Sequence, residues 1–204
     1  FIGDYLAAEL AVTGMDYEIA LNHADARGQA LALSATKAKA YTKNADAYSI
    51  TPVSYNSMQN DYCAVNFFDA IVFTSARKKT SWIKRVQGWT EGEFMGLYAT
   101  QRGDIGYNPP QPFMGDLNSK YNDGPICFTK DFNTVYFTRN NSGREERAKD
   151  GSYKLKFLEA QLDQNGFTMV RPMPFGDKEY NFAHPSVSAD GLELYFASDM
   201  EGGM

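Results

Sequence analysis

The residues best able to carry chemistry are few and lie far apart in the sequence. A transition-metal site needs several cysteines or histidines at short spacing, and the chain has only His23, His184, Cys63 and Cys127. Nucleophilic catalysis needs a base and an orienting acid beside the nucleophile. No Gly-x-Ser-x-Gly elbow, P-loop or dinucleotide-binding glycine motif occurs. We therefore expect a non-enzymatic protein without a metal site or bound cofactor.

Several polar residues fall at repeated positions where structural roles are common. Asp61, Asp123 and Asp199 lie at repeat edges, where carboxylates usually accept hydrogen bonds from turn backbone. We favour that role over a glycosidase pair or a calcium site in a loop. His184 precedes a proline on a predicted strand, so we expect a structural histidine rather than a ligand or base.

The two cysteines can be interpreted in two ways. A disulfide between Cys63 and Cys127 would need the two residues to be adjacent in space. The alternative, which we favour, is two small buried residues at related positions of two repeats, since each falls ten residues before a repeated phenylalanine.

The loop 77–89 has the strongest binding composition in the chain. It places both tryptophans among five basic residues. Tryptophan and arginine are enriched at interface hot spots, and loops on rigid scaffolds often carry function. We predict a partner-binding role for five of its residues: Arg77, Trp82, Lys84, Arg85 and Trp89. The alternative is a solvated insertion whose tryptophans pack on the sheet, and a second loop, 139–150, is charged and polar throughout.

These loops interrupt an internal repeat. Asn-Ser-x-x-Asn-Asp at 56–61 recurs at 118–123, 62 residues later, and a shorter trace of it appears at Tyr180 and Asn181. Each copy leads into two predicted strands, and the second strand of each pair contains Phe73, Phe137 or Phe196. The matching second strands are 70–75, 134–139 and 194–198.

The rest of each repeat matches as well. Residues 96–101 correspond to 156–161, and both copies then converge on Pro-x-Pro-Phe, at 110–113 and 172–175. Gly191 and Gly166 follow Asp and Asn, as in tight hairpin turns. One unit of about sixty residues therefore holds four antiparallel strands, which is typical of a β-propeller blade. A solenoid of the same repeats is the alternative, and either architecture should place the three phenylalanines in matching positions.

The spacing of apolar residues changes from helical to strand-like near residue 48. Residues 1–47 have the Ala- and Leu-rich spacing of short helices, either tetratricopeptide-like or a helical linker. Residues 48–204 alternate in the manner of strands, and we expect about two and a half blades that continue beyond Met204. The fold class is thus mainly β, a partial propeller preceded by a short α-helical segment.

Charge and hydropathy exclude some partners. The net charge of −5 argues against nucleic acid, whose phosphates require a positive surface. No apolar run of about 18 residues occurs, so we expect no membrane-spanning helix. The high aromatic content, 14%, favours a packed β-rich core over disorder.

The run 180–199, with its Pro-x-x-Ser strand, Asp-Gly turn and Leu-Tyr-Phe strand, resembles the TolB-like propeller repeat. Together with Asn-Ser-x-x-Asn-Asp, 71–77 and 198–203, it resembles the OmpA-family envelope proteins of Bacteroidetes, PorE-like and associated with type IX secretion. The chain departs from the pattern in having Cys63 where the second copy has Pro125, and in a shorter first turn.

The resemblance implies a scaffold at the periplasmic face of the outer membrane. It would bind proteins, such as PorP-like outer-membrane proteins or secretion components, and reach peptidoglycan through a domain not present here. Two alternatives remain: the accessory propeller of a prolyl-oligopeptidase-like hydrolase, and a periplasmic propeller that binds a small ligand. A nucleophile elbow beyond Met204 would favour the hydrolase, and an OmpA-like domain would favour the scaffold.

Overall fold

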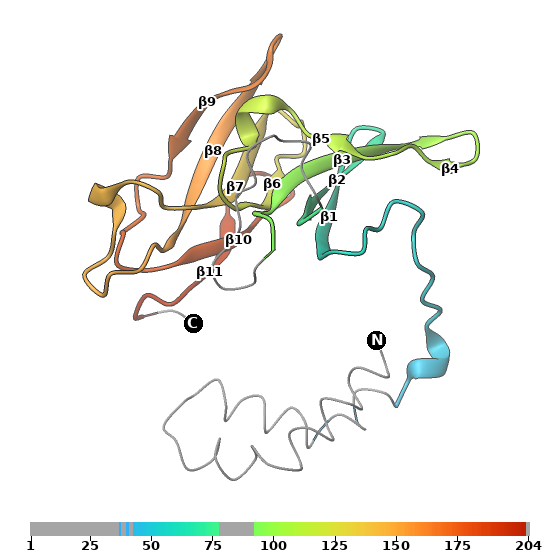
Figure 1. The fold of residues 1–204 in the computed structure, drawn as a ribbon, viewed down its shortest axis with the longest axis horizontal. Helices are drawn as coiled ribbons and strands as arrows, with labels where there is room; N and C mark the ends of the chain where they lie inside the picture. Colours follow the sequence, from blue (N-terminus) through green and yellow to red (C-terminus); the bar gives the residue numbers. More distant parts are fainter. Residues whose placement is uncertain (1–36, 38–39, 41–42, 78–91, 203–204) are drawn as a thin grey trace. The chain divides into compact units, whose positions relative to one another are not determined.

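A computed structural model describes residues 37, 40, 43–77 and 92–202 of the chain (Figure 1). The chain divides into two compact units, Phe1–Pro52 and Val53–Met204. The predicted helical segment 1–47 lies mostly outside the described residues. The part of it that is described contains a short 3-10 helix, η2 (Ala45–Ala47), and shows no α-helical segment.

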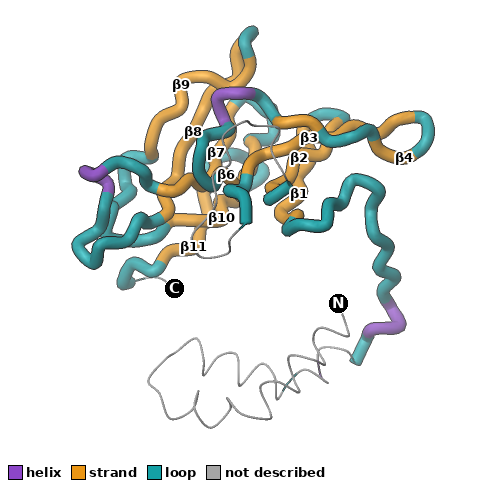
Figure 2. Tube along the Cα trace, viewed as in Figure 1, coloured by secondary structure: helices purple, strands orange, loops and turns teal. Residues whose placement is uncertain are grey.

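The second unit is mainly β (Figure 2), and its strands pair in the antiparallel sense. The first sheet has the order β1-β2-β3-β4, with β5 also paired to β3; the second has the order β6-β7-β8-β9; the third is the pair β10-β11. The strands are β1 (Asp61–Phe67), β2 (Ala70–Ser75), β3 (Gly96–Gly103), β4 (Gly106–Tyr107), β5 (Gln111–Pro112), β6 (Asp123–Phe128), β7 (Thr134–Asn140), β8 (Leu155–Asp163), β9 (Gly166–Pro172), β10 (Phe182–Val187) and β11 (Leu194–Ser198). Two 3-10 turns, η3 (Gly115–Leu117) and η4 (Arg144–Glu146), interrupt the connections.

The predicted strand pairs are confirmed in both complete sheets. The β8–β9 hairpin closes where Asp163 pairs with Gly166, whose φ of +105° suits glycine, as its turn sequence predicted. The Pro-x-Pro match is displaced by two residues. Pro112 pairs with Tyr98 and Pro172 pairs with Leu158, so Pro112 rather than Pro110 corresponds to Pro172.

A β-bulge interrupts the first strand of every sheet. It lies between Tyr62 and Val65 in β1, between Asp123 and Ile126 in β6, and between Ala183 and Ser186 in β10. Because every copy has its bulge at the same place, the correspondence between the first two copies changes only at the turn, which is two residues shorter between β1 and β2 than between β6 and β7. Counted from the strand partners, Cys63, Pro125 and His184 are equivalent, whereas Cys127 is equivalent to Val65.

The sheets are packed one behind another. Strand β6 contacts β1, β2 and β3 of the first sheet, and β10 contacts β6, β7 and β8 of the second. The largest apolar cluster fills the space between the first two sheets. It includes Phe67, Val72, Leu97, Phe113, Leu117, Ile126, Val135, Phe137, Leu158, Ala160 and Phe167. Because each sheet buries its faces only against its neighbours, burial at these positions depends on stacking.

The repeated phenylalanines occupy corresponding strands but differ in burial. Phe73 and Phe137 are almost completely buried, whereas 40% of Phe196 is exposed. Phe196 still packs toward the second sheet, with its ring centroid 5.3 Å from that of Phe157 and stacked on Phe175. Phe73 and Phe137 lie opposite residues of a third strand, Tyr98 and Leu158, whereas the third sheet has two described strands.

Two buried threonines at equivalent positions show how the sheets meet. Thr138 on β7 accepts a hydrogen bond from the backbone N–H of His184, at 3.3 Å. The hydroxyl of Thr74 on β2 is buried without a hydrogen-bond partner among the described residues. The residue equivalent to His184 in β6 is Pro125, which has no N–H to donate.

The same contact explains the glycine beside Pro125. A Cβ on Gly124 would lie 2.2 Å from Oγ1 of Thr74, and the φ of Gly124 is +99°. Only glycine combines that conformation with so close an approach. The first and second sheets therefore pack tightly here, at the cost of an unsatisfied hydroxyl.

This difference predicts opposite effects for one substitution made at two sites. Thr138→Val should lower the free energy of unfolding by about 1 kcal/mol, because it leaves the N–H of His184 without its acceptor. Thr74→Val should leave stability unchanged or raise it, because it removes a buried unpaired hydroxyl. Urea unfolding of the two variants measures this, and an equal loss in both would contradict the assignment.

Candidate functional site

One end of the sheets carries the longest connections. At this end of the first sheet, β1, β2 and β3 are aligned at Asp61, Ser75 and Gly96. At the same end of the second sheet, β6, β7 and β8 are aligned at Asp123, Arg139 and Lys156. We call it the loop end. From it emerge the β2–β3 connection (76–95) and the β7–β8 connection (141–154), as well as the segments that precede β1, β6 and β10.

A buried ion pair closes the loop end of the second sheet. The Asp123 carboxylate, fully buried, accepts a hydrogen bond from Nε of Arg139 at 2.5 Å. It also accepts the backbone N–H of Ser119, while the guanidinium of Arg139 donates to the Leu117 carbonyl and lies over the ring of Phe137. The pair therefore fastens the segment before β6 to the end of β7.

The first sheet repeats this arrangement with an arginine from another position. Asp61 accepts hydrogen bonds from the backbone N–H of Ser57 and from the Arg77 guanidinium, which lies 3.1 Å away and donates also to the Tyr55 carbonyl. In register, however, the residue opposite Asp61 is Ser75, two residues before Arg77. Because the β1–β2 turn is two residues shorter than the β6–β7 turn, Ser75 of β2 takes the position that Arg139 has in β7. Arg77 lies two residues after the end of β2 and still reaches Asp61.

This geometry changes the interpretation of Arg77. Its guanidinium is held between Asp61, the hydroxyl of Ser75, and the rings of Phe73 and Tyr98. Arg77 thus anchors the start of the loop in which we predicted partner binding. The other predicted binding residues lie outside the described part of the chain: Trp82, Lys84, Arg85 and Trp89.

Burial and hydrogen bonds act in opposite directions on the pKa of Asp61. Burial by itself raises that pKa, but hydrogen bonds from Ser75, Ser57 and Arg77 outweigh burial, and the net direction is downward. The carboxylate is therefore ionised across the neutral range and keeps its anchoring role. The predicted roles of Asp61, Asp123 and Asp199 as acceptors of backbone hydrogen bonds are confirmed, since Asp199 accepts the N–H of Asn181.

Asparagine side chains join successive sheets at the same end. The amide oxygen of Asn122 accepts the backbone N–H of Met95, just before β3. Asn181 does the same one sheet later, accepting the N–H of Leu155 at the start of β8. Asn118 adds contacts with both the N–H and the carbonyl of Leu97. These contacts fix where the third strands begin, and hence where the long connections end.

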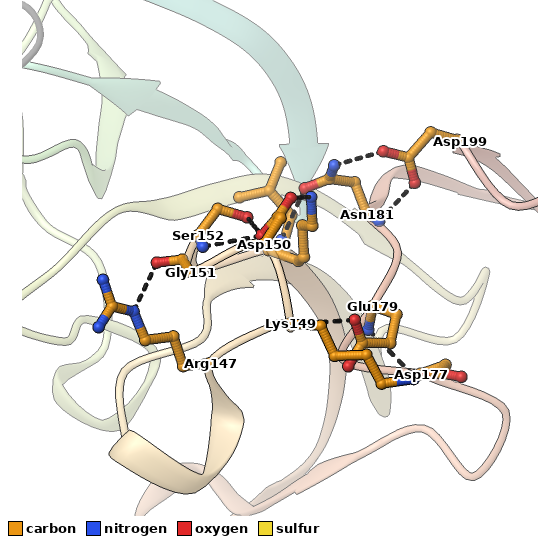
Figure 3. A network of polar contacts seen from close by, with 11 residues as sticks. Arg147, Lys149, Asp150, Gly151, Ser152, Asp177, Glu179, Asn181 and Asp199 are labelled. Carbon is orange, nitrogen blue, oxygen red and sulfur yellow. Dashed lines mark hydrogen bonds and ion pairs between the residues drawn. The ribbon is translucent and has the colours of Figure 1, made fainter.

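The β7–β8 connection is ordered by a network of polar contacts (Figure 3). The guanidinium of Arg147 binds the Gly151 carbonyl, and the backbone N–H of Lys149 donates to a Glu179 carboxylate oxygen at 3.0 Å. Asp150 pairs with Lys154 at 2.7 Å, and hydrogen bonds from Lys154 hold the Asp150 pKa well below its usual value. The network links this connection to the segment before β10.

The structure separates the two cysteines and exposes His184. Cys63 is exposed on the β1 bulge and Cys127 is half-buried on β6, and both are free thiols. The expectation of two buried cysteines at related positions is therefore wrong: Cys63 is exposed at the bulge, Cys127 is only half-buried, and the equivalent of Cys127 in the first sheet is Val65. His184 occupies the equivalent bulge position and is also exposed.

Other site types are not formed by the described residues. Within 43–77 and 92–202, no three His, Cys, Asp or Glu side chains come together as a metal ion would require. None of the helices described is long or apolar enough to cross a membrane. Among the described residues, the loop end combines the anchoring ion pairs and the polar network with the longest connections between strands.

Removing the buried anchor should cost more than removing its partly exposed counterpart. Asp123→Asn should lower the free energy of unfolding by about 3 kcal/mol, because Arg139 would lose its buried counter-ion. Asp61→Asn is the matched control and should cost less, since 10% of the Asp61 side chain is exposed whereas that of Asp123 is fully buried. Chemical denaturation measures the free energy of unfolding of both variants. A larger loss in Asp61→Asn than in Asp123→Asn would contradict the assignment.

The two thiols should differ in reactivity. Burial is the main cause that raises the pKa of Cys127 from 9.0 to about 11. Since the thiolate is the reactive form, Cys63 should be alkylated faster than Cys127 at pH 8. The Cys127 rate should still increase about tenfold per pH unit up to pH 10. Iodoacetamide labelling of Cys63→Ser and Cys127→Ser variants, followed by mass spectrometry, measures both rates, and equal rates at pH 8 would rule out the difference.

Comparison with known proteins identifies no family for this chain. No protein-family model matches it. No curated protein and no solved structure matches it either.

Proposed function

We propose that the chain is a non-catalytic protein-binding scaffold, that its sheets are blades of a β-propeller, and that its loop end is the binding surface. The observation that carries this proposal is the repeated anchoring of the loop end. In both complete sheets an Asp–Arg pair and asparagine side chains hold the ends of the strands in place. The connections between these anchors differ in length and sequence.

The packing of the sheets supports the propeller. The second sheet has four antiparallel strands in simple up-and-down order along the chain, and the first sheet has the same order with a fifth short strand, β5, also paired to β3. The first strand of the next sheet packs on the preceding one in both cases, β6 on the first sheet and β10 on the second. Radial stacking of blades gives this relation between consecutive sheets, and it leaves only short edges exposed.

The composition of the loop end supports a protein partner. Rigid scaffolds place binding residues on connections whose ends are fixed, because an ordered loop loses less entropy on association. The β7–β8 connection is ordered by its own network and exposes charges of both signs, among them Arg144, Glu145 and Lys149. Mixed exposed charge favours orientation of a protein surface over capture of a polyanion.

The resemblance of the repeat supplies the setting of the proposal. A TolB-like repeat together with the Asn-Ser-x-x-Asn-Asp motif suits a scaffold of the bacterial cell envelope at the periplasmic face of the outer membrane. There it would connect an outer-membrane or type IX secretion complex to peptidoglycan through another domain. PorP-like outer-membrane proteins are the partner class that the resemblance implies.

Site-specific photo-crosslinking tests the binding surface. A photoreactive residue at Arg144 or Lys149 should give a cross-linked protein in the cells that make the chain. The matched controls are Ile105 and Asn165, in turns at the opposite end of the strands. Cross-links confined to the controls, or absent from all four positions, would refute the proposal.

The captured protein must then bind directly. The purified partner should bind the purified chain with a dissociation constant in the micromolar range or below, about −8 kcal/mol or stronger. Replacing residues 142–153 with a Gly-Ser linker should weaken binding at least tenfold. Unchanged affinity in that variant would place the interface elsewhere.

A further inference from the structure

The turn of the β8–β9 hairpin contains the one asparagine of the sequence that precedes a glycine, Asn165. The hairpin closes where Asp163 pairs with Gly166, at the end of the second sheet opposite the loop end. Asn165 is exposed, and its side-chain amide makes no hydrogen bond with a described residue. The amide is therefore free to approach the backbone of the residue that follows it.

The glycine at position 166 leaves its own backbone nitrogen open to that approach. Glycine has no Cβ, so no side chain at this position shields the nitrogen from the side chain of Asn165. A bond between Cγ of Asn165 and the nitrogen of Gly166 closes a five-membered ring. Turns at hairpin tips open locally at a small cost in free energy, which gives the folded chain access to the ring-closing geometry.

Asn118 provides the contrast within the same molecule. Its amide oxygen accepts the N–H of Leu97, and its amide nitrogen donates to the carbonyls of Leu97 and Phe113. The backbone N–H of the next residue, Ser119, donates to the Asp123 carboxylate. Both groups that would form the ring are therefore held in place by hydrogen bonds.

We propose that Asn165 is a site of spontaneous deamidation in the folded chain, an inference that is independent of the proposed function. The nitrogen of Gly166 gives its proton to hydroxide and attacks Cγ of Asn165, forming a C–N bond. The bond from Cγ to the side-chain nitrogen then breaks, and ammonia leaves with a proton taken from water. The product is a cyclic imide, and no atom is oxidised or reduced.

Water completes the reaction by opening the imide at one of its two carbonyls. Attack at the side-chain carbonyl gives aspartate, and attack at the main-chain carbonyl gives isoaspartate. The sum of the steps converts an amide and water into a carboxylate and ammonium. In isoaspartate the main chain runs through the β-carbon, so a methylene group is added beside Gly166.

This change would weaken the hairpin. The Asp163 carboxylate accepts hydrogen bonds from the N–H of Asn165 and the hydroxyl of Thr168, and these bonds lower its pKa. The reaction would place a second negative charge two residues from this carboxylate, where like charges repel. Phe167 follows the altered bond and is 1% exposed in the cluster between the first two sheets. The modification at the turn therefore reaches the core.

Incubation of the intact chain in mildly alkaline buffer, followed by digestion and mass spectrometry, measures the reaction. Conversion of amide to acid should accumulate at least tenfold faster at Asn165 than at Asn118. Asn165→Gln should suppress conversion at this position, because glutamine would have to close a six-membered ring. Equal rates at Asn165 and Asn118, or no conversion at Asn165, would overturn the proposal.

A second variant shows whether the folded chain reacts. Thr138→Val should raise the unfolded population about fivefold at the loss of stability expected above, and it should leave the rate at Asn165 unchanged. A rate that rises with the unfolded population would mean that only the unfolded chain reacts, which would overturn the proposal. The thermal unfolding midpoint should fall during incubation of the wild-type chain and stay constant in Asn165→Gln. An equal fall in that variant would contradict the assigned effect on the hairpin.

Discussion

The interaction on which the architecture depends is the buried contact between Asp123 and Arg139. Placing a carboxylate and a guanidinium out of water costs several kcal/mol per ion unless further hydrogen bonds satisfy both groups. Here the N–H of Ser119 and the carbonyl of Leu117 supply those bonds. Both belong to the segment that leads from the first sheet into the second, so the ion pair is satisfied only when that segment is in place.

The strand pattern of the second unit could be predicted from the sequence because alternation and turn residues report local conformation directly. The correspondence between copies was harder to predict. The turn between β1 and β2 is two residues shorter than the turn between β6 and β7, and such a change has no composition of its own. Counting back from the phenylalanines therefore matched Cys63 with Cys127, whereas the pairing partners match Cys127 with Val65.

The candidate site was predictable in part, for a related reason. The repeated Asn-Ser-x-x-Asn-Asp motif identified the carboxylates, and the loop compositions identified the loop end. Nothing in the spacing distinguished Arg77 as an anchor from Arg77 as an exposed binding residue, because a guanidinium serves either role. The spacing of the repeat could have identified Arg77 as an anchor, because Arg139 follows Asp123 by the same 16 residues that separate Arg77 from Asp61.

The anchoring side chains recur in both complete sheets, whereas the connections between them vary. Residues that stabilise the fold are therefore different from the residues that the connections expose. The Asp, Arg and Asn side chains bind backbone atoms, so they constrain where a connection begins and ends but not its sequence. The β7–β8 connection can then carry exposed charges, among them those of Arg144, Glu145 and Lys149, without disturbing the core, because its ends are already fixed. In the same way the first sheet can hold a connection of different length and composition between Arg77 and Gly96. The proposed scaffold could change its partner by changing its loops, provided that the buried pairs remain.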